Sequence, residues 1–366
     1  MRVLVLNGPN LNLLGTREPE VYGTTTLPEL EAKISRWAEQ LGVVVTFQQF
    51  NQEGDIVTAI QEASGLDGIV INPGALTHTS RSIGDAIRSI GIPVVEVHIS
   101  NVKAREPWRA VSLVSESAVR TIYGRGFSGY RDALRHLANR AATPFETIRY
   151  GPHPDNIADL RQASNGAGGL VILIHGGFWL REWERDTMES LAVDLTGRGF
   201  TTLNVEYRRL GAGGVWPGSG HDVSTALNLV SHHPQLSSMS TAMVGHSAGG
   251  YLALWAASRP RNRSVELTVG LAAVTDLELL ADTDGAGSAP AHELLDRGAP
   301  AQVDDPASRT LLVHGQDDDL VAMTHSTRLD GSSDVELVAG LGHFEMLDPT
   351  REHWPPVIEA LHSMLS

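Results

Sequence analysis

The chain has 366 residues, no cysteine and a formal net charge of −15 at pH 7. This length suits two domains that each bury a core of their own. The absence of cysteine excludes disulfides, thiolate metal sites and a cysteine nucleophile, and the acidic balance argues against nucleic acid as a partner, because phosphates call for basic surfaces.

The charge changes abruptly along the chain. Residues 1–143 carry 14 Lys and Arg against 14 Asp and Glu, whereas residues 144–366 carry 14 against 29. A single folding unit has no reason to show such a step. The sequence therefore predicts a boundary near Thr143, with domains at 1–143 and 144–366 and a linker of only a few residues at 141–145.

Membrane and export signals are the next feature to consider. The first apolar run, MRVLVL, is too short for a signal peptide, and no run approaches the roughly 20 apolar residues that span a bilayer. We therefore expect a cytoplasmic protein with no membrane partner.

The first half alternates apolar runs with amphipathic segments. The runs are rich in Val, Leu and Ile and fall at residues 2–7, 43–49, 68–72, 93–100 and 120–124, with a last helix at Tyr130–Arg140. Near-continuous apolar strands are typical of a sheet whose two faces are both covered by helices. The pattern predicts an α/β fold with a doubly wound parallel sheet.

Polar side chains cluster after these strands, where ligands bind in such sheets. They are Asn7, Asn10, Asn12, Arg17, Tyr22, His78, His98, Arg105 and Arg109. The motifs LNGPNLNLLGTREPEVYG, NPGALTHTS, EVHISNVKARE and GRGFSGY together resemble type II 3-dehydroquinate dehydratase over essentially all of residues 1–143. The resemblance implies a flavodoxin-like five-stranded sheet, anti elimination of water from 3-dehydroquinate to give 3-dehydroshikimate, and no metal or other cofactor.

The resemblance also implies residue roles. Proton removal beside a ketone needs a base, an enolate stabiliser and an acid for the departing hydroxyl. Tyr22 would be the base, with Arg17 stabilising its phenolate, and Asn12 would hold the enolate through a water. His98 would be the acid, oriented by Glu96 and helped by Asn72. The substrate would be bound by His78, Asp85, Arg109 and the backbone of Ile99 and Ser100.

Three local features qualify this resemblance. Phe50 and Ala110 stand where the family usually has Ser and His, which affects local packing or subunit contacts. The stretch GRGFSG at 124–129 also spells GxGxxG, a weak dinucleotide signal when taken alone. It follows the last strand of its sheet, so we interpret it as a strand-to-helix turn and expect no nicotinamide cofactor.

The second half restarts the α/β pattern. Apolar runs fall at residues 146–151, 169–177, 201–207, 240–247, 267–274, 309–315 and 334–340, with helical stretches between most of them. They predict a second, mainly parallel sheet. Between a strand and a helix lies GHSAGG, whose GxSxG core is typical of a nucleophile elbow, and this makes Ser247 the candidate nucleophile.

The order Ser, acid, His locates the other members of a triad. Asp318 in HGQDDDLV fits the usual GxxDxxV spacing, which leaves Asp317 and Asp319 as surface acids, and His343 follows in GLGHFEMLD. The motif HGGFW precedes the nucleophile. Its N–H groups at Gly176, Gly177 and, as an open alternative, Phe178 would form the oxyanion hole with that of Ala248.

Residues 146–366 resemble the α/β-hydrolases of the esterase and arylformamidase (kynurenine formamidase) group. HGGFW and GHFEMLD are similar to the formamidase versions, whereas NVEYRR and GGVWPG are similar to general bacterial esterases. The resemblance implies Ser-His-Asp hydrolysis of a small ester or formamide, and it does not decide between these two substrate classes.

We therefore interpret the chain as a bifunctional fusion of a lyase and a hydrolase that act on small molecules. The first domain's family generally assembles as a dodecamer, so the resemblance implies a homo-oligomer. The alternative is that the first half only oligomerises a serine esterase; intact Tyr22, Arg17 and His98 argue against it.

Overall fold

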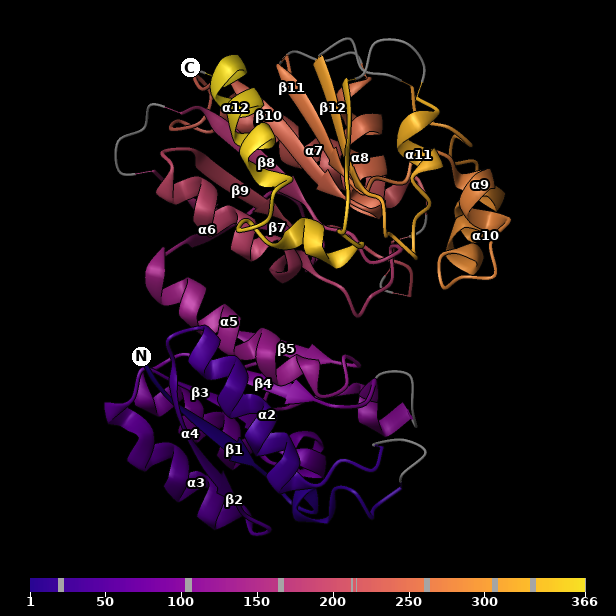
Figure 1. Cartoon of the computed structure of the whole chain (residues 1–366). Coiled ribbons are helices and arrows are strands. Elements are labelled where there is room, and N and C mark those ends of the chain that lie inside the picture. Colours follow the sequence, from indigo (N-terminus) through magenta and orange to yellow (C-terminus); the bar gives the residue numbers. More distant parts are fainter. Residues whose placement is uncertain are drawn as a thin grey trace. The chain divides into compact units, whose positions relative to one another are not determined.

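The computed structural model describes residues 1–18, 23–102, 107–163, 168–211, 213–214, 216–259, 264–304, 309–329 and 334–365. The chain divides into two compact units, Met1–Ala142 and Thr143–Ser366, which are coloured indigo to magenta and magenta to yellow in Figure 1. Within the described residues, no helix has the length and apolar character needed to cross a membrane.

The first unit is built on five parallel strands in the order β2-β1-β3-β4-β5. This order is that of the flavodoxin-like doubly wound sheet, which confirms the predicted fold. The strands are β1 (Arg2–Asn7), β2 (Val44–Gln49), β3 (Gly68–Asn72), β4 (Val94–His98) and β5 (Arg120–Tyr123). The helices are α2 (Leu27–Gln40), α3 (Glu53–Glu62), α4 (Arg81–Ile90) and α5 (Ser128–Ala142), with 3-10 turns at Leu11–Leu13, Ala63–Gly65, Gly74–His78 and Pro107–Ala110.

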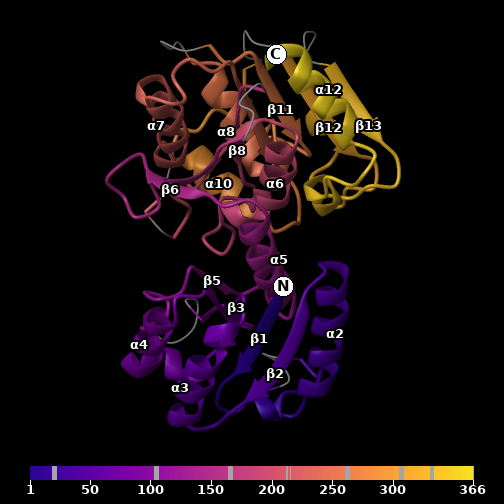
Figure 2. The same cartoon turned by 90° about the vertical axis from the view of Figure 1, so that its left-hand side faces the viewer.

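Helices cover both faces of this sheet (Figure 2). Because side chains alternate along a strand, Val3 and Val5 of β1 join the core under α2 and α5, whereas Leu4 and Leu6 join the core under α3 and α4. Both faces are thus apolar, and this explains why the strand sequences are continuous rather than alternating.

The second unit contains an eight-stranded sheet in the order β13-β12-β11-β10-β8-β9-β7-β6. The strands are β6 (Glu146–Arg149), β7 (Ile157–Arg161), β8 (Leu170–Ile174), β9 (Thr201–Val205), β10 (Thr241–His246), β11 (Leu267–Leu271), β12 (Arg309–Gly315) and β13 (Asp334–Val338). The six strands from β13 to β9 are mutually parallel, and β7 runs antiparallel to both β9 and β6. The mixed sheet confirms the predicted α/β-hydrolase fold.

Strand β7 is the one element of this sheet that the sequence pattern did not predict. Its apolar Ala158 and Leu160 alternate with Asp159 and Arg161, and all four are buried. Arg161 Nη2 lies 2.5 Å from Glu189 Oε1, and Asp159 pairs with Arg185 at 2.8 Å. The two charged residues give the segment a polar sequence, which does not indicate a buried strand. They can be buried only because the tertiary structure supplies a partner for each of them.

Helices also cover both faces of the second sheet (Figure 1). One core joins β8 to α7 (Gly218–His232), α8 (Ala248–Ala257), α9 (Leu277–Ala281) and α10 (Ser288–Asp296). The other lies under α6 (Glu189–Gly197) and α12 (Trp354–Leu365). The short α11 (Thr324–Thr327) and the 3-10 turns Arg185–Met188 and Phe344–Leu347 belong to the loops at the strand ends.

Candidate active sites

The first candidate site lies at the carboxyl edge of the five-stranded sheet. Asn7, Asn72 and His98 are the last residues of the neighbouring strands β1, β3 and β4, and all three are buried. Parallel pairing brings these ends to one edge, so residues distant in sequence lie close together. Polar side chains at such an edge form the place where ligands bind in doubly wound sheets.

His98 is held by a fully buried carboxylate. Its Nε2 lies 2.8 Å from Glu96 Oε1, and both side chains are almost inaccessible. Glu96 also accepts hydrogen bonds from the hydroxyls of Thr77, Ser112 and Thr121. Burial by itself would raise the pKa of Glu96, but the donors on His98, Thr77 and Ser112 outweigh it and hold that pKa below its usual value. The carboxylate therefore stays ionised and fixes the His98 ring.

Asn72 belongs to a chain of hydrogen bonds at the end of β3. Its Nδ2 donates to the Tyr130 hydroxyl at 3.0 Å, and its Oδ1 accepts from the Gly74 N–H at 3.2 Å. Tyr130 in turn donates to Asn7 Oδ1 at 2.7 Å. Asn72 is thus hydrogen-bonded to Tyr130 and Gly74, and its predicted help in positioning His98 stays a prediction. Tyr130 was missed as a site residue, although it closes the motif GRGFSGY.

The loop after β1 carries the predicted base and its neighbours. Asn12 is exposed on the 3-10 turn Leu11–Leu13, and Arg17 Nε lies 3.1 Å from Glu18 Oε2. Tyr22 and Arg105 lie outside the described residues, so the roles predicted for Tyr22 stay predictions.

The predicted substrate-binding residues divide into two groups. His78 Nδ1 lies 2.6 Å from the carbonyl of Val111, and its ring makes an edge contact with Trp108, over which Arg109 also stacks. His78 and Arg109 are therefore brought together around one indole ring. Asp85 is on α4, with 84% of its side chain exposed and an ion pair to Arg88.

The backbone of Ile99 and Ser100 is fixed by the turn that follows β5. Gly126 N–H donates to the Ile99 carbonyl at 3.0 Å, and Gly124 N–H donates to the Ser100 carbonyl at 3.2 Å. Both glycines have positive φ, 56° and 78°, which side chains disfavour. The motif GRGFSG thus serves as a strand-to-helix turn between β5 and α5.

The second candidate site lies at the carboxyl edge of the eight-stranded sheet. Ser247 sits between β10 and α8 with φ 54° and ψ −122°, a strained conformation for a residue with a side chain. A Cβ at Gly245 would lie 2.3 Å from the Gly249 carbonyl oxygen, and one at Gly249 would lie 2.2 Å from that of Ile174. Only glycine fits at either position, and this is the geometry of a nucleophile elbow.

Asp318 and His343 form the acid–base pair of this site. His343 Nδ1 lies 2.7 Å from Asp318 Oδ2, with both side chains buried. The N–H groups of Leu320 and Val321 each donate to Asp318 Oδ1 at 2.9 Å. Burial would raise the pKa of Asp318, but His314 and His343 together hold it well below its usual value. The carboxylate is thus ionised and fixed where it can orient the His343 ring.

The HGG segment after β8 lies directly against the nucleophile. A Cβ at Gly176 would come within 2.8 Å of Ser247 Cβ, and one at Gly177 within 2.2 Å of Trp183 Cβ. Ala248 opens helix α8, where N–H groups are free of helical partners. Gly176 therefore lies against Ser247, and Gly177 and Ala248 are the next residues along the chain from each of them. Ser247 Oγ is buried and has no hydrogen-bond partner among the described residues.

Comparison with known proteins identifies the first unit. The family model described as dehydroquinase class II matches residues 1–138. The chain is 55% identical over 137 residues to catabolic 3-dehydroquinase 1 of Neosartorya fischeri, which covers 37% of this chain and 91% of that protein. It is 54% identical over 139 residues to 3-dehydroquinate dehydratase 2 of Pseudomonas aeruginosa, with 38% and 94% covered.

The chain belongs to the class II dehydroquinases. The resemblance predicted for the first unit is thereby confirmed, and that unit is the dehydroquinase domain. The second unit matches the family model BD-FAE over residues 159–332. The solved structure of Esterase B from Lactobacillus rhamnosis shares its fold, with 21% identity, a TM-score of 0.52, and 63% of this chain and 91% of that one covered. An esterase-like α/β-hydrolase domain thus follows the dehydroquinase domain.

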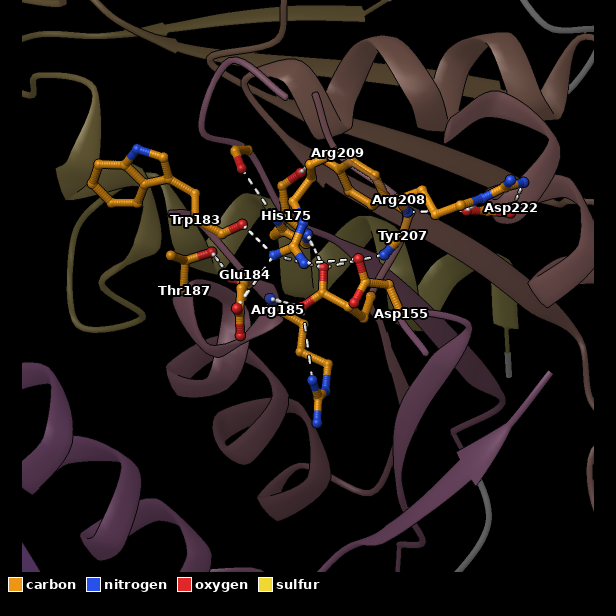
Figure 3. Close-up of polar contacts among 12 residues, drawn as sticks. Asp155, His175, Trp183, Glu184, Arg185, Thr187, Tyr207, Arg208, Arg209 and Asp222 are labelled. Atoms are coloured by element: carbon orange, nitrogen blue, oxygen red, sulfur yellow. Dashed lines mark hydrogen bonds and ion pairs between the residues drawn. The ribbon is translucent and has the colours of Figure 1, made fainter. Parts of the chain in front are cut away.

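A charged cluster beside the hydrolase site was missed by sequence reasoning. His175 Nε2 lies 2.9 Å from Glu206 Oε1, and Arg209 pairs with the same carboxylate at 3.3 Å. Figure 3 shows Arg209 between Asp155 and Glu184, to which it is also paired. The signal was present in NVEYRR, where acidic and basic residues follow strand β9, the neighbour of the strand that precedes HGG. In the described parts of both domains, no group of His, Asp and Glu side chains is arranged to hold a metal ion.

Proposed function

We propose that the chain is a bifunctional enzyme. The dehydroquinase domain dehydrates 3-dehydroquinate to 3-dehydroshikimate, and the hydrolase domain cleaves a small carboxylic ester with a Ser-His-Asp triad. The first activity is supported by relatives that are more than half identical and named for it. The second is supported by the BD-FAE match and by the buried pair of Asp318 and His343, whose ring lies 4.7 Å from that of His246, the residue before Ser247.

The dehydration proceeds through an enolate. Tyr22 removes the proton next to the ketone, Arg17 stabilises its phenolate, and Asn12 holds the enolate oxygen through a water. His98 then gives a proton to the departing hydroxyl, which leaves as water. The observation that supports this step is the 2.8 Å contact of His98 Nε2 with Glu96. It leaves Nδ1 as the ring nitrogen that delivers the proton.

Substrate binding completes the proposal for the first domain. His78 and Arg109, which meet at Trp108, bind the carboxylate and hydroxyls together with the backbone of Ile99 and Ser100. Asp85 belongs to the same proposed set, although its exposed position on α4 gives it no contact with the other members in the described part of this chain.

The hydrolysis follows the general route of serine hydrolases. His343 takes the proton of Ser247 Oγ as that oxygen attacks the ester carbonyl, and the N–H groups of Gly176, Gly177 and Ala248 stabilise the oxyanion. His343 returns the proton to the leaving alcohol, and water cleaves the acyl-enzyme by the same steps. We favour an ester over a formamide, because the matched family and the neighbour of the same fold are both esterase-like.

Paired kinetics on two variants test the whole proposal. The full chain is assayed for the ultraviolet absorbance of the enone product and for cleavage of p-nitrophenyl acetate. We expect Tyr22→Phe to abolish the first activity and spare the second, and Ser247→Ala to do the reverse. Loss of both activities from either change would contradict two independent sites.

The same assays decide the alternative that the first domain is a scaffold. A wild-type protein that forms no enone while it cleaves p-nitrophenyl acetate would establish the scaffold and reject the dehydratase. A panel with esters of quinate-type acids and N-formylkynurenine then separates ester from formamide hydrolysis. Preference for the formamide would overturn the ester assignment.

A further inference from the structure

The hydrolase domain fixes both peptide groups that carry its glycine N–H donors. In a trans peptide the C=O and the following N–H point in opposite directions, so holding the carbonyl also aims the N–H. The carbonyl of His175 accepts a hydrogen bond from the Tyr207 hydroxyl at 2.9 Å. The Gly176 N–H of that peptide is therefore directed away from Tyr207.

The next peptide is held by the His175 ring itself. His175 Nδ1 lies 2.8 Å from the Gly176 carbonyl oxygen. A carbonyl can only accept, so Nδ1 carries a hydrogen, and the Gly177 N–H of the same peptide points the other way. The two consecutive donors are thus oriented by two contacts, one from the phenol and one from the imidazole.

The His175 ring is fixed in turn by residues that follow the adjacent strand β9. Its Nε2 faces Glu206 Oε1 at 2.9 Å, and its face stacks on the Tyr207 ring with centroids 4.3 Å apart. Glu206 also accepts from the Arg185 backbone N–H at 3.1 Å and pairs with Arg209 at 3.3 Å. Figure 3 draws His175, Tyr207 and Arg209 in one cluster. The ring is fully buried, so these contacts leave it one position.

We propose that Tyr207 is a positioning residue for the hydrolase, which holds the His175–Gly176 peptide so that the oxyanion-hole N–H groups face the transition state. This inference rests on the proposed serine hydrolase activity. A preorganised donor acts mainly in the transition state, so its loss lowers kcat more than it raises KM. A residue that only stabilised the fold would leave both parameters of the folded enzyme unchanged.

The decisive variant is Tyr207→Phe, which keeps the stacked ring and removes only the hydroxyl. We expect kcat for p-nitrophenyl acetate to fall at least about tenfold, or about 1.4 kcal/mol of transition-state stabilisation, with KM changed less than about twofold. Inhibition by phenylboronic acid, whose tetrahedral adduct places an oxygen in the oxyanion hole, should weaken by the same factor as kcat/KM.

Tyr251→Phe is the matched control. Tyr251 is also buried, and its hydroxyl donates to a backbone carbonyl, that of Pro300, at 2.7 Å. We expect similar loss of thermal stability in the two variants and wild-type kinetics only in Tyr251→Phe. Wild-type kcat and boronate affinity in Tyr207→Phe, or equal kinetic losses in both variants, would overturn the inference.

Crystal structures of the two variants give a readout that needs no turnover. The His175–Gly176 peptide should rotate or adopt two orientations in Tyr207→Phe and stay unchanged in Tyr251→Phe. An unchanged peptide in Tyr207→Phe would overturn the inference. A wild-type chain that cleaves no ester would instead overturn the proposed hydrolase function, and the peptide orientation would still decide the role of Tyr207.

Discussion

Three consecutive aspartates follow strand β12, and only the middle one is buried against His343. Asp317 and Asp319 are exposed, whereas the Asp318 side chain is inaccessible and receives two backbone N–H groups as well as His343. A carboxylate in this position selects the His343 tautomer with hydrogen on Nδ1, and this leaves Nε2 free to accept the serine proton.

Asp318→Asn is therefore expected to lower kcat for ester cleavage by about 10³–10⁴-fold, because an amide N–H opposite Nδ1 selects the wrong tautomer. Steady-state kinetics on p-nitrophenyl acetate measure the effect. Asp317→Asn and Asp319→Asn are matched controls and should stay within about twofold of wild type. A comparable loss of kcat in either control would show that Asp318 is not the acid of the triad.

Two buried histidines make the stability of the hydrolase domain depend on pH. Burial, reinforced by His343, lowers the pKa of His246 to about 3, and burial lowers that of His325 to about 4. In the unfolded chain both histidines have a pKa near the ordinary value of 6.5. Both pKa values are depressed on folding, so their contribution is complete above pH 6.5 and is lost as the pH falls toward the folded values.

We expect each histidine to lower the free energy of unfolding by on the order of 1–2 kcal/mol between pH 7 and pH 5. Hydrogen exchange of second-unit peptides in the full chain measures this loss at the two pH values. In His325→Asn, the amide oxygen can still accept the Thr275 N–H that His325 Nδ1 accepts, and the titrating group is gone. The free energy of unfolding of His325→Asn should therefore fall less between pH 7 and pH 5 than that of the wild type. An equal fall in both proteins would show that His325 does not cause the pH dependence.

At the scale of elements, the hydrolase site depends on how closely helix α8 approaches strand β8. The approach brings the first turn of α8 against the carbonyls of Ile174 and His175, where a Cβ on Gly249 would lie 2.2 Å and 2.4 Å from the two oxygens. Backbone atoms cannot yield as a flexible side chain can. The spacing that presents Ser247 to the HGG segment is thus set by a glycine.

Gly249→Ala should therefore separate α8 from β8, with loss of ester hydrolysis by at least about 100-fold and destabilisation of about 2–4 kcal/mol. Activity and thermal unfolding of the full chain measure the two effects. Gly197→Ala, at the open carboxyl end of α6 where a Cβ meets nothing within 4 Å, should be neutral or stabilise by up to about 1 kcal/mol. Equal behaviour of the two variants would refute the packing argument.

At the scale of the whole molecule, the hydrophobic cores are segregated. Two core clusters contain only residues of Met1–Ala142, and the other two contain only residues of Thr143–Ser366. The start of the second unit is tied into that unit, because Arg161 donates to the Thr143 carbonyl at 3.2 Å and stacks over Phe145. Each unit therefore holds what a domain needs in order to fold alone.

Separate expression of Met1–Ala142 and Thr143–Ser366 should give two folded proteins, each with one activity within about threefold of the full chain. Circular dichroism and the two assays measure this outcome. A second fragment that begins at Ser164 lacks β6, β7 and Arg161, and it should not fold. Failure of Met1–Ala142 to fold by itself would contradict independent domains.

Light scattering on the full chain and on Met1–Ala142 tests the assembly that the resemblance implies. A dodecamer in both is the expected outcome for this family, and a dodecamer of the fragment beside a smaller full chain would show that the fusion changes assembly. Phe50, which packs partly buried against the core under α3 and α4, has a structural role within the unit.

The sequence by itself determined most of the strands and the order of the candidate catalytic residues along the chain. Continuous apolar runs predicted all five strands of the first sheet and seven of the eight strands in the second, because the hydrophobic period is local. Ser247, Asp318 and His343 followed from motif and order, since each sits in a glycine-rich turn with its own local geometry.

Only the tertiary structure decided which polar groups are partners. Arg161 of β7 is paired with Glu189, Asn72 donates to Tyr130, and Tyr207 reaches the His175 carbonyl from the loop after β9. These contacts join strand residues or loop residues to helices and loops that are distant in the chain. A buried charge or hydroxyl is stable only with its partner, and the sequence lists the partners without saying which of them meet.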